Sequence, residues 1–292
     1  HVGAKWANVI RYRWPEFKRY ARFFYDMPNF FTLLNIDGRA VPAHATTTVY
    51  PDPHVESTSV DGTPYTASWT GASWATNRAA SDAYDAPDDE EFIDMINHYA
   101  VNAFMRTWTL FDTSSISAGD VVTAAVISVT GHDTRDESGT GELHYVTISG
   151  GAPASNTALV VADWSAMTAL NSPTEFVTRT LNQTNIDEDD SAYNNSLTLN
   201  ADGRAAVAKG GITKFIWRDS RDVDNSGQAA DTNNHARCRS AEYTGTSKDP
   251  KLVVTHAAGS DVEKINGLAL ADIEKFNGIT AANAQKINTV TF

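Results

Sequence analysis

Residues 107–129 read T-W-T-L-F-D-T-S-S-I-S-A-G-D-V-V-T-A-A-V-I-S-V, which is two apolar, β-rich runs separated by a turn. The first run ends at Phe111 and the second begins at Val121, and Ala118-Gly119-Asp120 between them supplies turn residues. Because Thr, Val, Ile, Trp and Phe are enriched in strands, this stretch predicts two successive antiparallel strands.

The same pattern continues on both sides of this stretch. Short β-rich runs occur at Thr46–Tyr50, Trp74–Ala80, Asn102–Phe111, Val121–Thr130, Leu143–Ser149, Ala158–Trp164, Phe176–Leu181, Leu197–Leu199, Ile212–Arg218, Arg239–Tyr243 and Lys251–His256. Many short strands without long helices between them predict an all-β fold, an antiparallel β-sandwich or jelly roll, over residues 45–257. One helical turn is expected between Asn200 and Lys209, because Asn200 can cap it.

Residues 1–44 form a basic, aromatic-rich arm ahead of this domain. Phe17, Tyr20 and Phe24 are spaced as on one face of a helix, which predicts an amphipathic helix between Pro15 and Pro28. So much aromatic area cannot be buried by the segment alone. Two interpretations stay open, packing on the chain's own β-domain or burial in a neighbouring subunit, and base stacking on nucleic acid is a third.

Residues 258–292 contain a repeat with a period of 11 residues, Lys-Ile-Asn-Gly from Lys264, Lys-Phe-Asn-Gly from Lys275 and a shortened copy from Lys286. Each unit is predicted to be an extended stub, an Asn-Gly turn and a short helix such as Ala271–Glu274. Repeat units of this size fold only when stacked on neighbours, so the tail predicts assembly. The predicted assembly residues are Trp6, Trp14, Phe17, Tyr20, Phe24, Ile265, Asn266, Gly267, Phe276, Asn277 and Gly278.

Charge is divided unevenly along the 292 residues, whose formal net charge is −13. Residues 1–44 hold seven Lys or Arg against three acids, and the remaining residues hold 16 against 33. An acidic body repels nucleic acid, so nucleic acid is not an expected partner. No apolar run is long enough to suggest a membrane span, and no membrane association is expected.

The motifs of common enzymes are not found in the sequence. Its eight histidines show no H-x-x-x-H or H-E-x-x-H spacing, and neither a G-x-S-x-G elbow nor a P-loop occurs. Acidic runs such as Asp88-Asp89-Glu90-Glu91 are interpreted as solvated loops, and the single Cys238 forms no disulfide within the chain. The sequence therefore predicts a protein that is not an enzyme, with no catalytic residues and no required cofactor.

Two candidate ligand sites remain. Asp222, Asp224 and Ser226, followed by Gly227, match the start of an EF-type calcium loop, and a plain turn between strands is the alternative interpretation. Aromatic side chains near turns can stack on sugar rings, which makes Trp69 and Trp74, and more weakly Trp164, candidates for sugar contact. Trp108 and Trp217 lie within strand patterns and are assigned to the core.

Several segments together resemble DNRLRE-type β-sandwich domains. The carriers of the resemblance are F-D-T-S-S-I-S-A-G from Phe111, D-P-K-L-V-V-T from Asp249, Asp61-Gly62 with W-A-T-N-R from Trp74, and Leu197–Trp217. The string that names the family is absent, and Ser81–Asn97 resembles an insertion. The C-terminal repeat is similar to short tails of phage virion proteins. The resemblance implies a carbohydrate-binding-like module, a surface protein or a phage structural protein.

These observations favour a phage virion structural protein, such as a decoration, neck, tail accessory or fibre component. Its expected partners are other virion proteins and further copies of itself, and its expected place is the virion surface. The alternative is a secreted carbohydrate-binding or adhesin module at a cell surface, with surface glycans as partners. Three segments are expected, an arm at 1–44, a sandwich at 45–257 and an assembly tail at 258–292.

Overall fold

The computed structural model describes residues 44–66, 72–99, 103–137, 142–227 and 233–258, together with four two-residue strands between residues 264 and 280. The first five ranges belong to one compact unit, His44–Gly259. The predicted helical arm lies outside the described residues.

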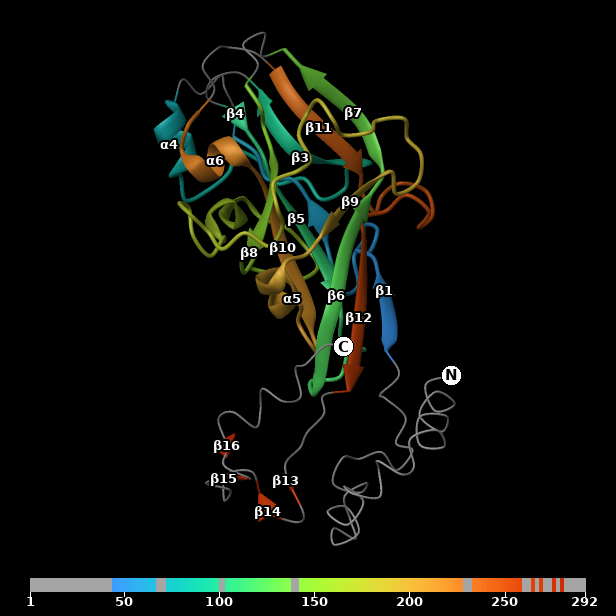
Figure 1. Cartoon of the computed structure of the whole chain (residues 1–292). Helices are drawn as coiled ribbons and strands as arrows, with labels where there is room; N and C mark the ends of the chain where they lie inside the picture. The colour runs from blue at the N-terminus through green and yellow to red at the C-terminus, as the bar shows by residue number, and fades with distance from the viewer. Residues whose placement is uncertain are drawn as a thin grey trace, which may run out of the picture. The chain divides into compact units, whose positions relative to one another are not determined.

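Three antiparallel four-stranded sheets make up this unit (Figure 1). The first sheet has the order β1 (Ala45–Val49), β12 (Lys251–Ala258), β6 (Asp120–Val129) and β9 (Asn195–Thr198). The second has the order β2 (Asp61–Gly62), β5 (Arg106–Asp112), β10 (Ile212–Asp219) and β8 (Val146–Gly150). The third has the order β4 (Ala103–Phe104), β3 (Phe92–Tyr99), β11 (Asn233–Arg239) and β7 (Gly131–Asp136).

One hydrophobic core is shared by all three sheets. It includes Ile127 and Leu252 from the first sheet, Phe215 and Trp217 from the second, and Cys238 from the third, all nearly inaccessible to solvent. Since side chains alternate between the two faces of a strand, these residues mark the faces that the sheets turn toward one another. The architecture is a β-sandwich, as the sequence predicts.

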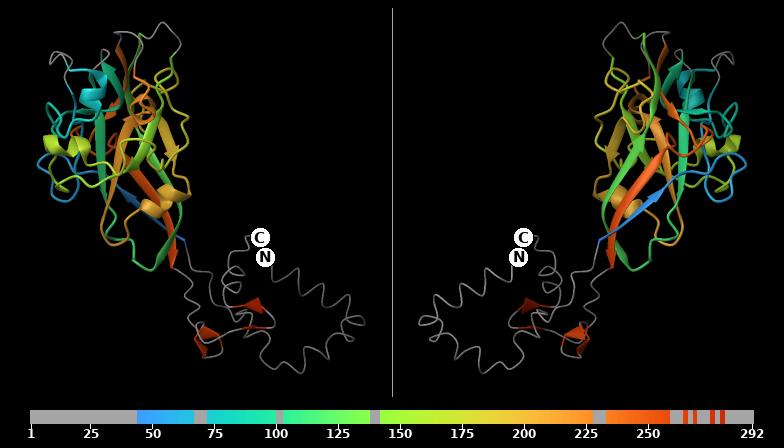
Figure 2. Two further views of the ribbon diagram at one scale, coloured as in Figure 1. Left: turned by 90° about the vertical axis from the view of Figure 1, so that its left-hand side faces the viewer. Right: turned by 90° about the vertical axis from the view of Figure 1, so that its right-hand side faces the viewer.

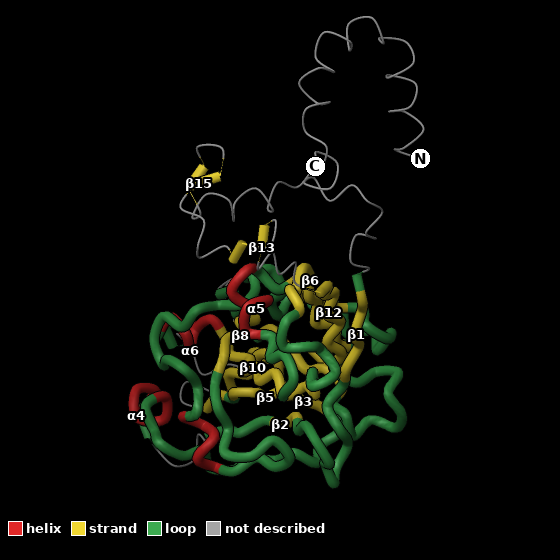
Figure 3. The backbone as a smooth tube through the Cα atoms, turned by 90° about the horizontal axis from the view of Figure 1, so that it is seen from below, coloured by secondary structure: helices red, strands yellow, loops and turns green. Residues whose placement is uncertain are grey.

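The second sheet is also covered on its opposite face. Trp108, Leu110 and Ile216 project there and pack with Val60 and Leu159, which come from loops. Figure 3 shows these loops (green) around the strands, with β2 and β5 next to them. The predicted core positions of Trp108 and Trp217 are confirmed, because both indoles are fully buried.

The predicted strands agree with β1, β5, β6, β8, β10 and β12. The helical turn expected after Asn200 is α5 (Ala201–Ala206), and the Asn200 side chain accepts a hydrogen bond from the Gly203 backbone N–H at 2.9 Å. This is the contact of an N-cap, which satisfies an amide that the helix leaves free.

Three predicted strands are wrong. Residues Trp74–Arg78 form helix α4, capped by Ser73, whose hydroxyl accepts from the Thr76 backbone N–H at 3.2 Å. Val161–Ser165 is the 3-10 helix η2. Within Phe176–Leu181 the structure has only an isolated bridge from Val177 to Leu199. In the first case a local cap outweighed the β-propensity of the run.

The sequence pattern missed strands β2, β3 and β7 and nearly all of β11, and most of β3 lies within Ser81–Asn97, the segment that resembles an insertion. The run G-H-D-T-R-D in β7 and the run N-N-H-A-R-C-R in β11 have almost no apolar alternation. Polar pairs between strands stabilise β7 and β11 in place of apolar contacts. Arg237 binds Asp94 at 3.0 Å, and His235 binds Asp133 at 2.9 Å. The prediction of Arg239–Tyr243 as a strand overlaps only the last residue of β11.

In the tail, the structure describes two separate antiparallel strand pairs. Lys264–Ile265 (β13) pairs with Leu268–Ala269 (β14), and Lys275–Phe276 (β15) pairs with Ile279–Thr280 (β16). The extended stubs before each Asn-Gly are thus present, and each has a partner strand that the sequence did not predict. The short helix predicted at Ala271–Glu274 lies outside the described residues.

Within the described residues, no helix has the length and apolar character needed to cross a membrane.

Candidate functional site: a buried histidine–aspartate cluster

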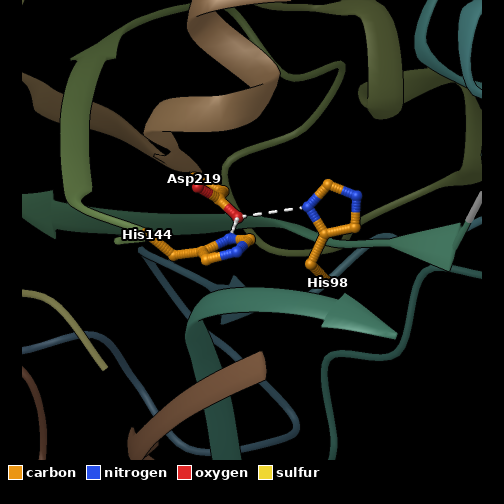
Figure 4. Close-up of side chains that lie close together, drawn as sticks. All are labelled: His98, His144 and Asp219. Atoms are coloured by element: carbon orange, nitrogen blue, oxygen red, sulfur yellow. Dashed lines mark hydrogen bonds and ion pairs between the residues drawn. The ribbon is translucent and has the colours of Figure 1, made fainter. Parts of the chain in front are cut away.

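Two histidines and one aspartate from three strand ends meet inside the sandwich (Figure 4). His98 is near the end of β3, and His144 stands just before β8. Asp219 ends β10 and caps helix α6 (Ser220–Asp224). Strands β8 and β10 are paired, so their ends are neighbours, and the third sheet brings His98 to the same place.

A single carboxylate oxygen faces both imidazoles. Oδ2 of Asp219 lies 2.5 Å from Nδ1 of His144 and 3.3 Å from Nδ1 of His98. The side chains of all three residues are fully buried. The two rings meet edge to face, with centroids 5.5 Å apart. Figure 4 shows the carboxylate between the two rings.

The second carboxylate oxygen of Asp219 caps the start of helix α6. It accepts a hydrogen bond from the Arg221 backbone N–H at 2.9 Å, the contact of an N-cap. Burial alone would raise the pKa of Asp219, but His144 and His98 hold this pKa well below its usual value. The group is therefore a carboxylate at neutral pH, and it joins a helix start to two strand ends.

Trp74 covers the cluster on one side. Its indole stacks on the His98 ring, with centroids 4.7 Å apart and 12° between the planes, and it also contacts Phe104. Its Nε1 donates to Oδ1 of Asn225 at 3.2 Å, which connects α4 to the end of α6. Trp74 is half-buried by these contacts. Trp74, one of the two predicted sugar-binding residues, thus uses part of its surface for packing. The other, Trp69, lies outside the described residues.

The donor set favours hydrogen bonding over metal binding. One ligand atom from each of His98, His144 and Asp219 lies within 4.8 Å of the other two, which is close enough to share an ion. A metal-bound histidine normally donates its other ring N–H to an acceptor. Here Nε2 of each histidine is buried with no hydrogen-bond partner. Both imidazoles instead direct Nδ1 at the Asp219 carboxylate, which fits a hydrogen-bonded link between strand ends.

A second buried cluster lies beside the first, around Asp222 of α6. Its carboxylate accepts from Arg106 at 2.8 and 2.9 Å and from Arg218 at 2.6 Å, and Arg78 lies 3.2 Å away. Burial would raise the pKa of Asp222, and Arg106 and Arg218 lower it to about 2. The three guanidinium groups also donate to backbone carbonyls of helices and loops. These carbonyls belong to Arg78, Trp164, Ala169, Leu170, Asp222 and Val223.

The EF-type calcium loop predicted from Asp222, Asp224 and Ser226 is not the geometry observed. Asp222 and Asp224 are in the helical turn α6, which ends at Asn225 in the left-handed conformation. The arginines occupy both oxygens of Asp222, and Arg179 binds both oxygens of Asp224 at 2.6 and 2.8 Å. The two carboxylates face different cations, so they do not form one oxygen cage.

Other predicted site residues are placed as follows. Trp164 is fully buried, with the Arg106 guanidinium 3.9 Å from its ring centroid, so it is closed to a sugar. Of the predicted assembly residues, the structure describes only Ile265 and Phe276, as members of β13 and β15. The rest lie outside the described residues.

Sequence reasoning missed the histidine–aspartate cluster. His98, His144 and Asp219 are separated by 46 residues or more, so no local spacing connects them. The arginines of the second cluster also come from three separate elements. Only the alternation of polar residues inside otherwise buried strands, as in Thr107 and Arg106 of β5, hinted at polar groups in the interior.

In comparisons with known proteins, no protein-family model matches the chain. No curated protein matches it in sequence either.

Proposed function

We propose that this protein is a non-enzymatic structural subunit of a virion-type assembly, in which the sandwich is the body and the two terminal segments are the anchors. The single observation that carries this proposal is the pairing of β1 with β12. Ala45, the first residue of β1, stands opposite His256 near the end of β12. Both flanking segments therefore leave the sandwich from adjacent positions at one end.

That end of the sandwich, which we call the anchor pole, is held together by His256. Nδ1 of this histidine lies 2.6 Å from Oδ2 of Asp120 at the start of β6, and its Nε2 lies 2.9 Å from Oγ1 of Thr47 in β1. The side views show the first strand (blue) and the last strand (orange-red) of the sandwich reaching this end together (Figure 2). His256 thus connects β12 to both β1 and β6 at the end where the two flanking segments begin.

The composition of the flanking segments supports an anchoring role. The ten aromatic residues of the arm each offer about 150–250 Å² of surface. Burial of half of them at about 25 cal/mol/Å² is worth more than about 15 kcal/mol before ordering costs. The arm is basic and the remainder of the chain acidic, so copies can attract one another end to body.

The buried clusters support a role as a rigid body. Asp219 and Asp222 connect strand ends, helix α6 and the loop at residues 169–170 by charge-assisted hydrogen bonds, which are stronger than neutral ones. These groups are sealed from solvent, where they can stabilise the fold but cannot reach a dissolved substrate. The expected partners are other virion proteins and further copies of this chain.

Deletion of residues 1–44 tests the proposal. The full chain is expected to form a defined oligomer by native mass measurement and to co-purify with particles, and the deletion is expected to abolish both. Replacement of Phe17, Tyr20 and Phe24 by Ser is expected to have the same effect. The matched comparison, replacement of Lys18, Arg19 and Arg22 by Ala, keeps the aromatic face and should weaken assembly less than the aromatic replacement does. A monodisperse monomer at micromolar concentration, unchanged by the deletion, would contradict the proposal.

A further inference from the structure

A group of carboxylates without a cationic partner lies around β2. It consists of Glu56, Asp61, Asp88, Glu242 and Asp249, and we call it the acidic rim. Among the described residues, no Lys or Arg forms an ion pair with any of them, and only the His54 imidazole lies next to Glu56. This contrasts with Asp222, which has three arginines around it.

Four of these carboxylates have a buried oxygen that lacks any hydrogen-bond partner. These oxygens are Oε1 of Glu56, Oδ1 of Asp61, Oε2 of Glu242 and Oδ1 of Asp249. Glu56, Asp61 and Asp249 are 7%, 0% and 1% exposed. An unpartnered buried carboxylate is costly, since burial removes the water that would stabilise its charge. Half of the unsatisfied buried side-chain atoms of the described residues are thus concentrated in one place.

Backbone contacts fix the members of the acidic rim next to one another. The His54 backbone N–H donates to Oε1 of Glu242 at 3.1 Å, and the Ala241 backbone N–H donates to Oδ2 of Asp61 at 3.2 Å. Two chain segments more than 180 residues apart are therefore held side by side.

Asp88 reaches the same place because β2 has no side chain at Gly62. A Cβ atom there would lie 2.5 Å from the Pro87 carbonyl oxygen and 2.9 Å from Cα of Asp88. Only glycine allows this close approach. The Thr63 backbone N–H also donates to the Pro87 carbonyl at 3.0 Å. Oδ2 of Asp88 accepts from the Leu159 backbone N–H at 2.9 Å, which fixes its orientation.

His54 and two members of the acidic rim, Glu56 and Asp88, lie close enough to share one ion. One ligand atom from each of His54, Glu56 and Asp88 is within 4.8 Å of the other two. Nδ1 of His54 is 3.3 Å from Oε2 of Glu56. The His54 side chain is 47% exposed, so an ion from solvent can reach the site. The unpartnered Oε1 of Glu56 supplies an additional buried ligand atom.

The loop that carries His54 and Glu56 is held in shape before any ion binds. Oδ2 of Asp52 accepts from the backbone N–H groups of Ser57 and Thr58 at 3.1 and 2.6 Å and from both of their hydroxyls. The Asp52 backbone N–H in turn donates to the Ser59 carbonyl at 2.8 Å. A preformed loop lowers the ordering cost of ligand binding.

We propose that His54, Glu56 and Asp88 bind a divalent transition-metal ion of the Zn²⁺ or Mn²⁺ type. One imidazole with two carboxylates is a donor set used by first-row ions, whereas Ca²⁺ takes oxygen ligands. Glu242, which accepts a hydrogen bond from the His54 backbone N–H, lies beside this site and adds to its attraction for a cation. The site is independent of the assembly function proposed above.

Titration of the full chain with Zn²⁺ at pH 7.5, after treatment with a chelator, tests the site. We expect one ion per chain and a higher melting temperature in Zn²⁺. His54→Ala and Asp88→Asn should each weaken binding at least tenfold, and Asp88→Asn keeps the acceptor for the Leu159 amide. The matched controls are Asp89→Asn, an exposed neighbour of Asp88, and Asp224→Asn, from the calcium loop that the sequence predicts.

Four results would overturn the proposal. The first is the absence of stoichiometric Zn²⁺ and Mn²⁺ binding to the full chain. The second is binding that survives both His54→Ala and Asp88→Asn in variants that melt cooperatively. The third is Ca²⁺ binding that exceeds Zn²⁺ binding and ignores His54→Ala, because an oxygen-only site has no use for the imidazole. Loss of binding in Asp224→Asn with retention in Asp88→Asn would place the ion in α6 instead.

Discussion

Nδ1 of His144 lies 2.5 Å from Oδ2 of Asp219, and neither side chain is exposed to solvent. Because Asp219 also accepts from His98 and from the Arg221 amide, one carboxylate holds three elements. We expect Asp219→Ala to lower the free energy of unfolding by at least about 3 kcal/mol, since it removes two charge-assisted hydrogen bonds and a helix cap. Urea unfolding at pH 7 measures this loss.

Asp219→Asn is the informative companion to this variant. Asparagine caps helices as well as aspartate does, so the start of α6 should survive. The amide carries no charge for His144 and His98, and a loss of about 2 kcal/mol is expected. Equal stabilities of wild type and Asp219→Ala would show that the cluster does not hold the strand ends together.

The acidic rim predicts an unusual dependence of stability on pH in metal-free protein. Burial raises the pKa of Asp249 to about 7, whereas an unfolded aspartate titrates near about 4. Between these values the folded state binds more protons than the unfolded state, so stability falls as pH rises. Relative to Asp249→Asn, wild type should lose stability from about pH 4 to about pH 7 and then stay level.

The lowered pKa of Asp219 predicts the opposite dependence of stability on pH. Its pKa is lower when folded, so its contribution is present above about pH 4, the unfolded value, and is lost as pH falls. Unfolding of wild type, Asp249→Asn and Asp219→Asn in urea from pH 3 to pH 9 separates the two effects. A wild-type advantage over Asp249→Asn that grows between pH 4 and pH 7 would contradict the raised pKa of Asp249.

The sequence could predict the sandwich because its apolar strands carry their own signal. Runs such as Val121–Thr130 and Ile212–Arg218 place β-branched and aromatic residues where the core needs them. The polar strands β7 and β11 were missed because they are stabilised by pairs across strands, Arg237 with Asp94 and His235 with Asp133, whose members lie far apart in the sequence. Neither clusters nor polar strands follow from local periodicity, because their partners meet only after folding.

The Asp222 cluster predicts a sharp contrast between two aspartates of one helix. Asp222→Ala would leave Arg78, Arg106 and Arg218 buried without their carboxylate, and breaking such a buried pair costs about 3–5 kcal/mol. Asp224→Ala removes a partly exposed pair with Arg179, worth about 1 kcal/mol or less. Thermal unfolding of both variants tests this contrast.

Comparison of Asp224→Ala with wild type decides between the observed geometry and the predicted calcium loop. Because arginines bind both carboxylates in wild type, millimolar Ca²⁺ should leave the melting temperatures of both metal-free proteins unchanged. A calcium-dependent rise in wild type that disappears in Asp224→Ala would restore the calcium loop.

The contacts of Trp74 predict that its replacement weakens packing, whereas a sugar-binding role predicts a loss of glycan binding. Its half-buried indole stacks on His98 and Phe104, so Trp74→Ala should cost about 2 kcal/mol, less than a fully buried tryptophan. Trp74→Phe keeps the stacking and should recover most of this loss. A glycan array with wild type and Trp74→Phe provides the second measurement. Reproducible glycan binding by wild type that Trp74→Phe abolishes would favour the adhesin interpretation over the structural one.

The anchor pole depends on His256, which contacts Asp120 in β6 and Thr47 in β1. Removal of this side chain should release β1 without disturbing the core, because β1 pairs only with β12 in its sheet. We expect His256→Ala to increase amide hydrogen exchange at least tenfold over Ala45–Val49, and to leave β5 and β10 protected. Thr46→Ala, an exposed position of the same strand, is the matched control. Because the arm leaves the sandwich through β1, His256→Ala should also weaken assembly. Unchanged exchange together with unchanged assembly would show that the His256 contacts do not support anchoring.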